Sequence, residues 1–145
     1  MKTYKTLYPL TLFVCTVDEL NKLTKRFNGH DTIEELRASV NPKVIKIDAS
    51  SYHGFTGLVQ EKTTGRYGVL VCLEDVDASV TTIAHESVHV ADAIFDYSGA
   101  TTQEFDYSNE PYAYLVGWIA GCISDYLIEV KYNNEKNEEI KKENN

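Results

Sequence analysis

The sequence has few of the residues that cross-link a chain. Its three cysteines, Cys15, Cys72 and Cys122, are odd in number, far apart and without a Cys-x-x-Cys pair. This spacing disfavours a disulfide framework, and it also disfavours a cysteine metal site, because thiolate zinc sites use close ligand pairs. All three lie in apolar runs, so we expect buried, reduced thiols.

Long hydrophobic runs are also missing. Near the amino terminus, Tyr8, Pro9 and Thr11 interrupt any signal-type apolar core. The longest apolar run, residues 112–123, contains glycines and is too short to cross a bilayer. These absences predict a cytoplasmic protein.

Basic residues are scarce relative to acidic ones. The chain has 14 Lys and Arg against 22 Asp and Glu, a net charge of −8. Such a chain lacks the basic surface that tracks phosphates or anionic lipids, so we expect no nucleic acid and no membrane as partner. The charge does not favour a particular substrate or oligomeric state.

The 145 residues suffice for one domain with its own core. We expect that domain to span residues 1–130. From Lys131 on the sequence is Asn, Lys and Glu with one Tyr and one Ile, which predicts a solvated tail over residues 131–145, either frayed helix or disordered.

Hydrophobic periodicity predicts an α+β chain. Residues 54–61 and 66–73 are β-type runs joined by a turn, which predicts a hairpin, and the continuous apolar run 69–73 predicts a central strand buried on both faces. The other expected strands are 7–16 and 43–48. The expected helices are 17–27 with Asn28-Gly29 as its stop, 32–40, one over the segment from Thr82, and one from Ser108 or Asn109 to about Val130.

The sequence His85-Glu86-Ser87-Val88-His89 has the form His-Glu-x-x-His. On a helix, residues four apart share a face, so His85 and His89 can direct two imidazoles at one zinc ion. Glu86 is then placed to act as general base on a zinc-activated water. The alternative is that both histidines are core residues hydrogen-bonded to backbone carbonyls. The apolar residues around the motif instead favour a helix that lines a cleft.

A zinc site needs a third protein ligand, and Glu110 is the best candidate. Glu110, Ala113, Tyr114, Gly117 and Gly121 share one helical face, whose small residues would allow close approach to the motif helix. The alternative ligands are Asp92, Asp96, Glu104 and Asp106. Asp92 is the foremost of these, although it could instead accept a hydrogen bond from a ligand imidazole.

The motif His85–His89, followed after one loop by Asn109-Glu110-Pro111-Tyr112-Ala113, resembles the gluzincin branch of zinc metallopeptidases, and most of all its small stand-alone bacterial or phage members. The resemblance implies a zincin-like fold, with a mixed, mainly antiparallel sheet of about four strands packed on the motif helix and a downstream Glu helix. It implies Zn²⁺ as cofactor, His85, His89 and Glu110 as ligands, Glu86 as base, and a peptide or protein substrate.

Two further predictions concern that activity. The run from Phe55 to Gln60 would be the sheet edge that receives an extended substrate. The donor for a developing oxyanion would be one of Tyr107, Tyr112, Tyr114 and His53, whereas His30 and His53 otherwise have the character of loop or surface residues. The competing hypotheses are a catalytically inactive zinc-binding module and a small interaction protein with incidental histidines.

Overall fold

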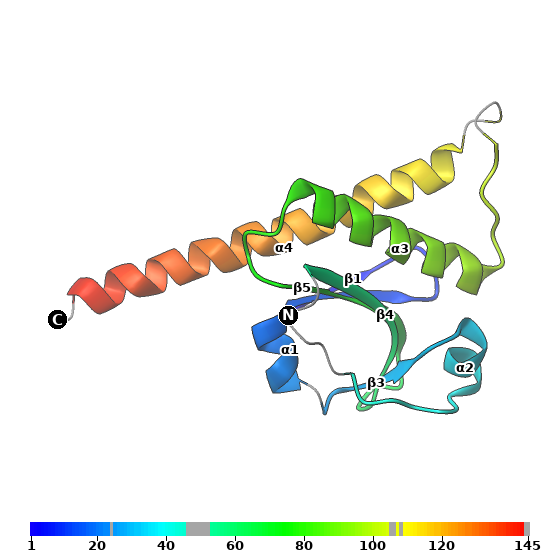
Figure 1. The fold of residues 1–145 in the computed structure, drawn as a ribbon, viewed down its shortest axis with the longest axis horizontal. Helices are drawn as coiled ribbons and strands as arrows, with labels where there is room; N and C mark the ends of the chain where they lie inside the picture. Colours follow the sequence, from blue (N-terminus) through cyan, green and yellow to red (C-terminus); the bar gives the residue numbers. More distant parts are fainter. Residues whose placement is uncertain (24, 46–52, 105–106, 108, 144–145) are drawn as a thin grey trace.

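The structure is a computed structural model that describes residues 1–23, 25–45, 53–104, 107 and 109–143. It is an α+β fold with a mixed five-stranded sheet and four helices (Figure 1). The strands are β1 (Lys2–Lys5), β2 (Thr11–Thr16), β3 (Phe27–His30), β4 (Gly54–Glu61) and β5 (Tyr67–Leu73). The helices are α1 (Val17–Leu23), α2 (Ile33–Ala38), α3 (Val80–Ser98) and α4 (Glu110–Glu143).

The strand order is β1-β2-β5-β4-β3, with β2 and β5 parallel and every other pair antiparallel. The predicted hairpin is confirmed as β4 and β5, and β5 is the central strand expected from its continuous apolar run. Cys15 and Cys72 lie side by side in register on β2 and β5. All three cysteines are buried and free, as predicted, and a hydrogen bond to Cys72 together with burial raises the pKa of the Cys15 thiol.

The sheet has one more strand than the four expected, and its two outer strands were not predicted. Residues 27–30 form β3, so the prediction that Phe27 ends a helix and that Asn28-Gly29 stops it was wrong. The Phe27 ring packs on Phe13 at 4.9 Å between centroids, a contact that periodicity along the chain does not reveal. Of the predicted strand 43–48, Lys43 forms a single bridge to Gly29, and residues 46–48 lie outside the described residues.

Each face of the sheet carries an apolar core. The α3 and α4 side buries Leu12, Val14, Val69 and Val71 of the sheet beneath both helices. The opposite side buries Phe13, Cys15, Phe27, Val59, Leu70 and Cys72 against α1. Alternate residues of β2 and β5 therefore belong to different cores, which explains why these strands are apolar throughout.

Helix α3 has a defined beginning and end. The Ser79 hydroxyl accepts a hydrogen bond from the Thr82 amide, and Gly99, at φ 68°, closes the helix with its amide on two preceding carbonyls. Serine is among the residues preferred at this position, because its side-chain oxygen accepts a hydrogen bond from a backbone amide of the first turn. The left-handed conformation at Gly99 is the usual reason for glycine at this position.

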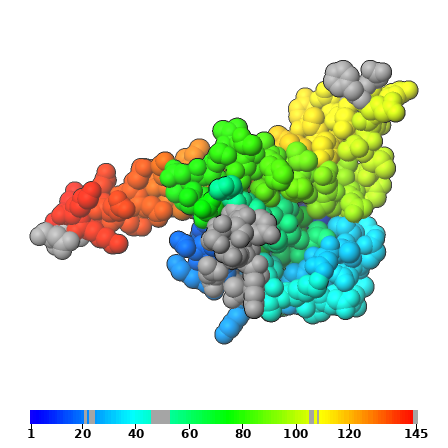
Figure 2. Space-filling view, in the orientation of Figure 1, coloured from blue at the N-terminus to red at the C-terminus, as the bar shows by residue number. Residues whose placement is uncertain are grey.

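Helix α4 continues beyond the point where the sequence predicted its end near Val130. Its first part buries Leu115, Ile119 and Ile123, whereas every residue from Lys131 to Glu143 is exposed, and this end projects beyond the rest of the molecule (Figures 1 and 2). By length and composition, α4 is the one helix in the described residues that could cross a membrane, but one third of its most apolar window is buried within the fold.

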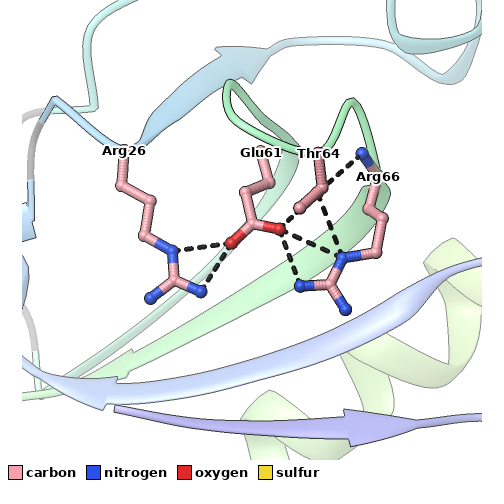
Figure 3. A network of polar contacts seen from close by, with 4 residues as sticks. All are labelled: Arg26, Glu61, Thr64 and Arg66. Carbon is pink, nitrogen blue, oxygen red and sulfur yellow. Dashed lines mark hydrogen bonds and ion pairs between the residues drawn. The ribbon is translucent and has the colours of Figure 1, made fainter.

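At the turn of the β4–β5 hairpin, the buried Glu61 carboxylate is surrounded by donors (Figure 3). Arg26 and Arg66 bond its two oxygens with contacts of 2.5 to 3.0 Å, and the Thr64 hydroxyl donates to one of them. Burial would raise the pKa of Glu61, but the bonds from Thr64, Arg66 and Arg26 outweigh it and lower that pKa to about 2. The network ties β3 and the hairpin together at the end of the sheet.

Because this carboxylate has a folded-state pKa below its ordinary value of 4.5, its charge stabilises the fold above that pH and the effect is lost as the pH falls towards 2. We expect Glu61→Gln to lower the free energy of unfolding at pH 7 by on the order of 3 kcal/mol, with the difference from wild type shrinking steadily between pH 5 and pH 2. Urea unfolding of both proteins across this range measures it. A difference that does not change with pH would contradict the account.

Candidate metal and active site

Helix α3 brings the two motif histidines together at the surface of a cleft. The Nε2 atoms of His85 and His89 are 3.0 Å apart, with ring centroids 4.6 Å apart and ring planes at 81°. Two nitrogens bound to one tetrahedral zinc ion at about 2.05 Å are separated by about 3.3 Å. The pair therefore has the spacing of two ligands of a shared ion, and without an ion one neutral imidazole can donate its Nε2–H to the other.

The cleft lies between α3 and β4 and has a volume of about 670 Å³. His85, Glu86, His89 and Ala93 line it from α3, and residues 54–58 line it from β4. His30 and Asp31, at the end of β3, are also among the lining residues. The predicted motif helix thus borders an open cavity large enough for several residues of an extended peptide.

Glu86 is a largely buried residue in the wall of the cleft. Its side chain is 4% exposed, and its Oε2 accepts a hydrogen bond from the Thr56 hydroxyl at 2.6 Å. Strand β4 also leaves room for the carboxylate at Gly54, where a Cβ atom would stand 2.7 Å from Oε1. A buried carboxylate without donors would be unfavourable, so Thr56 and Gly54 are the residues that allow Glu86 to occupy this position.

Sequence reasoning missed both residues of β4. They lie about 30 positions before Glu86, and nothing in a strand pattern indicates which of its residues faces a distant helix. Their only sequence signals are a small residue and a hydroxyl residue two apart on a predicted strand, which places both on the same face of the sheet.

The structure does not bring Glu110 to the histidine pair. Glu110 is exposed at the start of α4, which packs beside the C-terminal half of α3 through Tyr112 on Phe95, with ring centroids 5.2 Å apart. The face of α4 that was predicted to approach α3 is turned to solvent: Ala113 and Tyr114 are exposed, and a Cβ at Gly117 would have no neighbour within 4 Å. That predicted packing face was wrong.

The alternative acidic ligands are also apart from the pair. Asp92 accepts a hydrogen bond from the Tyr112 hydroxyl at 2.5 Å, and burial together with this bond raises the pKa of Tyr112 to about 12. Asp96 and Glu104 are exposed, and Asp106 lies outside the described residues. Within the part of the chain that the structure describes, no three His, Cys, Asp or Glu side chains form a group able to hold one metal ion.

None of the predicted oxyanion donors lines the cleft. Tyr112 is bonded to Asp92, and His53 is exposed with its Nδ1 2.7 Å from Glu74. Tyr107 and Tyr114 are exposed on α4 and the segment before it. The four candidates therefore do not supply a hydrogen-bond donor beside Glu86 in this structure.

His30 is the other cleft residue that sequence reasoning misplaced. It is buried on β3, not at the surface, and its Nδ1 lies 3.0 Å from the Val40 carbonyl oxygen. Its Nε2 has no hydrogen-bond partner among the described residues. The prediction failed because β3 itself was not predicted.

The sequence matches no protein-family model, and no curated protein or solved structure gave a match.

The fit between Gly54 and Glu86 leads to a prediction about stability. We expect Gly54→Ala to destabilise the wild-type fold by about 1–3 kcal/mol, because the new methyl group forces the Glu86 carboxylate from its place beside Thr56. In a Glu86→Ala background the same substitution should cost much less, since the clashing atoms are gone. Chemical denaturation of the four proteins of this double-mutant cycle measures the coupling. Equal costs in the two backgrounds would contradict the arrangement.

Proposed function

We propose that this protein is a zinc-dependent peptide hydrolase in which His85 and His89 bind the metal and Glu86 is the general base. The observation that supports this most directly is the convergence of the two Nε2 atoms beside a buried carboxylate in one open cleft. A purely structural zinc site is closed and needs no neighbouring base. We also propose that the protein acts in the cytoplasm, on peptides or proteins, with neither nucleic acid nor membrane as partner.

The metal would be held by His85 and His89, with Glu110 as the proposed third ligand and Asp92 as the next candidate. Imidazole pairs with one carboxylate are a common donor set for catalytic zinc. When bound, the ion supplies Lewis acidity, which lowers the pKa of a coordinated water and polarises a carbonyl group. In the structure Glu110 is exposed, so its role as ligand requires the start of α4 to approach the cleft.

Glu86 would accept the proton from the attacking water and deliver it to the leaving amine. Thr56 donates to its Oε2 and thereby fixes the orientation of the carboxylate. The second oxygen, Oε1, lies beside Gly54. Because Gly54 has no side chain, no Cβ atom occupies the space next to this oxygen. These two contacts would hold the base in one geometry before substrate arrives.

The substrate would add to β4 as an extended strand. Strand β4 pairs with β5 over Gly54–Gln60 but with β3 only over Leu58–Glu61, so in the described residues Gly54–Gly57 have no ladder partner on the second side. The predicted edge from Phe55 to Gln60 is thus corrected to the shorter stretch from Gly54 to Gly57. It adjoins Glu86, and backbone pairing there would bring a peptide bond to the cleft.

A second candidate function is a zinc-binding module without catalytic activity. One observation favours it: none of the four candidate oxyanion donors is among the residues that line the cleft beside Glu86. Such a module would bind zinc in the wild type and in Glu86→Gln equally, and would cleave nothing.

The test of the proposed function compares the wild type with Glu86→Gln, an isosteric change that keeps the hydrogen bond from Thr56. We expect both proteins to bind zinc, and only the wild type to cleave a panel of unfolded proteins and peptides, with a loss of at least about a hundredfold in the variant. Mass spectrometry of the products and metal analysis of the same samples provide the two readouts.

Two controls separate the possible failures. Dialysis against a chelator should abolish cleavage by the wild type, and added zinc should restore it. Cleavage retained by Glu86→Gln would contradict the assigned base, and zinc binding without cleavage by either protein would support the inactive module. Zinc retained by Glu110→Ala would remove Glu110 from the ligand set and leave the histidine pair and base intact.

A further inference from the structure

The solvent face of α4 carries a second apolar seam. Its residues are spaced alternately by four and three, the spacing of a coiled-coil interface. We call this set the outer stripe; it consists of Tyr114, Trp118, Gly121, Asp125, Ile128 and Tyr132. The stripe spans about 27 Å of helix at 1.5 Å per residue. It lies on the opposite side of α4 from Leu115, Ile119 and Ile123, which pack on the core.

The outer stripe is exposed although four of its six members are large apolar or aromatic residues. Tyr114 is 75% exposed, Ile128 67%, Tyr132 63% and Trp118 41%. These residues form two pairs, Tyr114 with Trp118 and Ile128 with Tyr132, on either side of Gly121 and Asp125. Large apolar residues gathered on one exposed helix face are typical of an interaction site. The last turns of α4, residues 131–143, which begin within the stripe at Tyr132, are all exposed, and helical segments that bury little surface are marginally stable in water.

We propose that the outer stripe binds the same stripe of a second copy of this chain, with the two α4 helices antiparallel. In the antiparallel register that places Trp118 opposite Gly121 of the second copy, the two-fold axis repeats that contact. The space beside Gly121 is open, because a Cβ atom at this position would meet no atom within 4 Å. The Trp118 indole of the second copy then fills that space. Large side chains thus meet small ones at the centre of the interface.

The same register pairs Tyr114, Asp125 and Ile128 with residues of the second copy, whereas Tyr132 extends past the start of the second α4. Tyr114 lies opposite Asp125 of the second copy, so that a phenol hydroxyl can donate to the only carboxylate in the stripe. Pro111 lies opposite Ile128. A parallel pair would instead place Asp125 against Asp125 and leave Gly121 facing Gly121, which is unfavourable in charge and in packing.

A cavity beside the stripe completes the fit. It has a volume of about 530 Å³ and lies between the loop before β2 and the first half of α4. Leu7, Pro111, Tyr114 and Trp118 are among its walls, and the Leu7 side chain is fully exposed. In the antiparallel register, Ile128 of the second copy faces the Pro111 wall of this cavity. Each copy would therefore offer both the protruding residue and the cavity that receives it, as a two-fold interface requires.

A lipid bilayer is the other possible cover for an apolar stripe. Asp125 lies in the middle of the stripe, and burying an isolated carboxylate in hydrocarbon is unfavourable. The net charge of −8 also opposes binding to anionic lipid. A second copy satisfies Asp125, whereas a bilayer does not.

The first experiment measures the mass of the full-length protein in solution by sedimentation equilibrium across a range of micromolar concentrations. We expect a dimer of twice the 16.4 kDa chain mass. Ile128→Lys should raise the dimer dissociation constant by at least about tenfold, because it places a charge in the apolar interface. Asn134→Lys adds the same charge at an exposed position of α4 outside the stripe and should leave the dimer unchanged.

The second experiment tests the register with disulfide formation between copies. A mixture of Tyr114→Cys and Asp125→Cys proteins should form the mixed disulfide, and the wild type should form none because its cysteines are buried. A wild-type monomer at every concentration, or an Ile128→Lys variant as dimeric as the wild type, would overturn the proposal. So would Asp125→Cys cross-linking to itself, which indicates a parallel pair, or flotation of the wild type with neutral phosphatidylcholine vesicles that Ile128→Lys abolishes.

Discussion

The contact between Glu86 and strand β4 is the interaction on which the candidate site depends. A carboxylate that is 4% exposed needs a donor and space, and β4 provides the Thr56 hydroxyl and the missing side chain of Gly54. Together with the apolar packing of Val90, Ala91 and Ile94 on the sheet, this contact orients α3. When Glu86 points towards β4, the adjacent face of α3 is exposed. That face places His85 and His89 at the cleft, where their Nε2 atoms are 3.0 Å apart. This one orientation of α3 therefore buries the proposed base, Glu86, and places the two proposed metal ligands at the exposed surface of the cleft.

Much of the fold could be predicted because it is determined by short-range patterns. The β4–β5 hairpin and the central position of β5 each depend on residues that are close in sequence. The helical spacing of four brings His85 and His89 together by geometry that any α-helix shares. The burial of the three cysteines followed from the apolar runs around them.

The remaining features depend on contacts between distant segments. Phe27 continues the helical spacing of α1 but belongs to β3, because its ring packs on Phe13 across the sheet. Helix α4 has two apolar faces, one through Leu115 and Ile119 and one through Tyr114 and Trp118, and periodicity does not decide which of them packs on α3. The face that was predicted to pack on α3, which holds Glu110, Tyr114 and Gly117, is turned to solvent, and Glu110 lies apart from the histidines. The same ambiguity leaves a second seam exposed on the outside of the molecule.

The central claim is that one metal ion is bound by both histidines of α3. X-ray absorption at the zinc edge of the zinc-loaded wild-type protein measures this most directly, because it counts imidazole ligands and reports their distances. We expect two imidazole nitrogens at about 2.0–2.1 Å from the zinc ion, and one when His89 is replaced by alanine. A spectrum without imidazole scattering, or a protein that takes up no zinc, would contradict it and leave His85 and His89 as a hydrogen-bonded pair at the surface of the cleft.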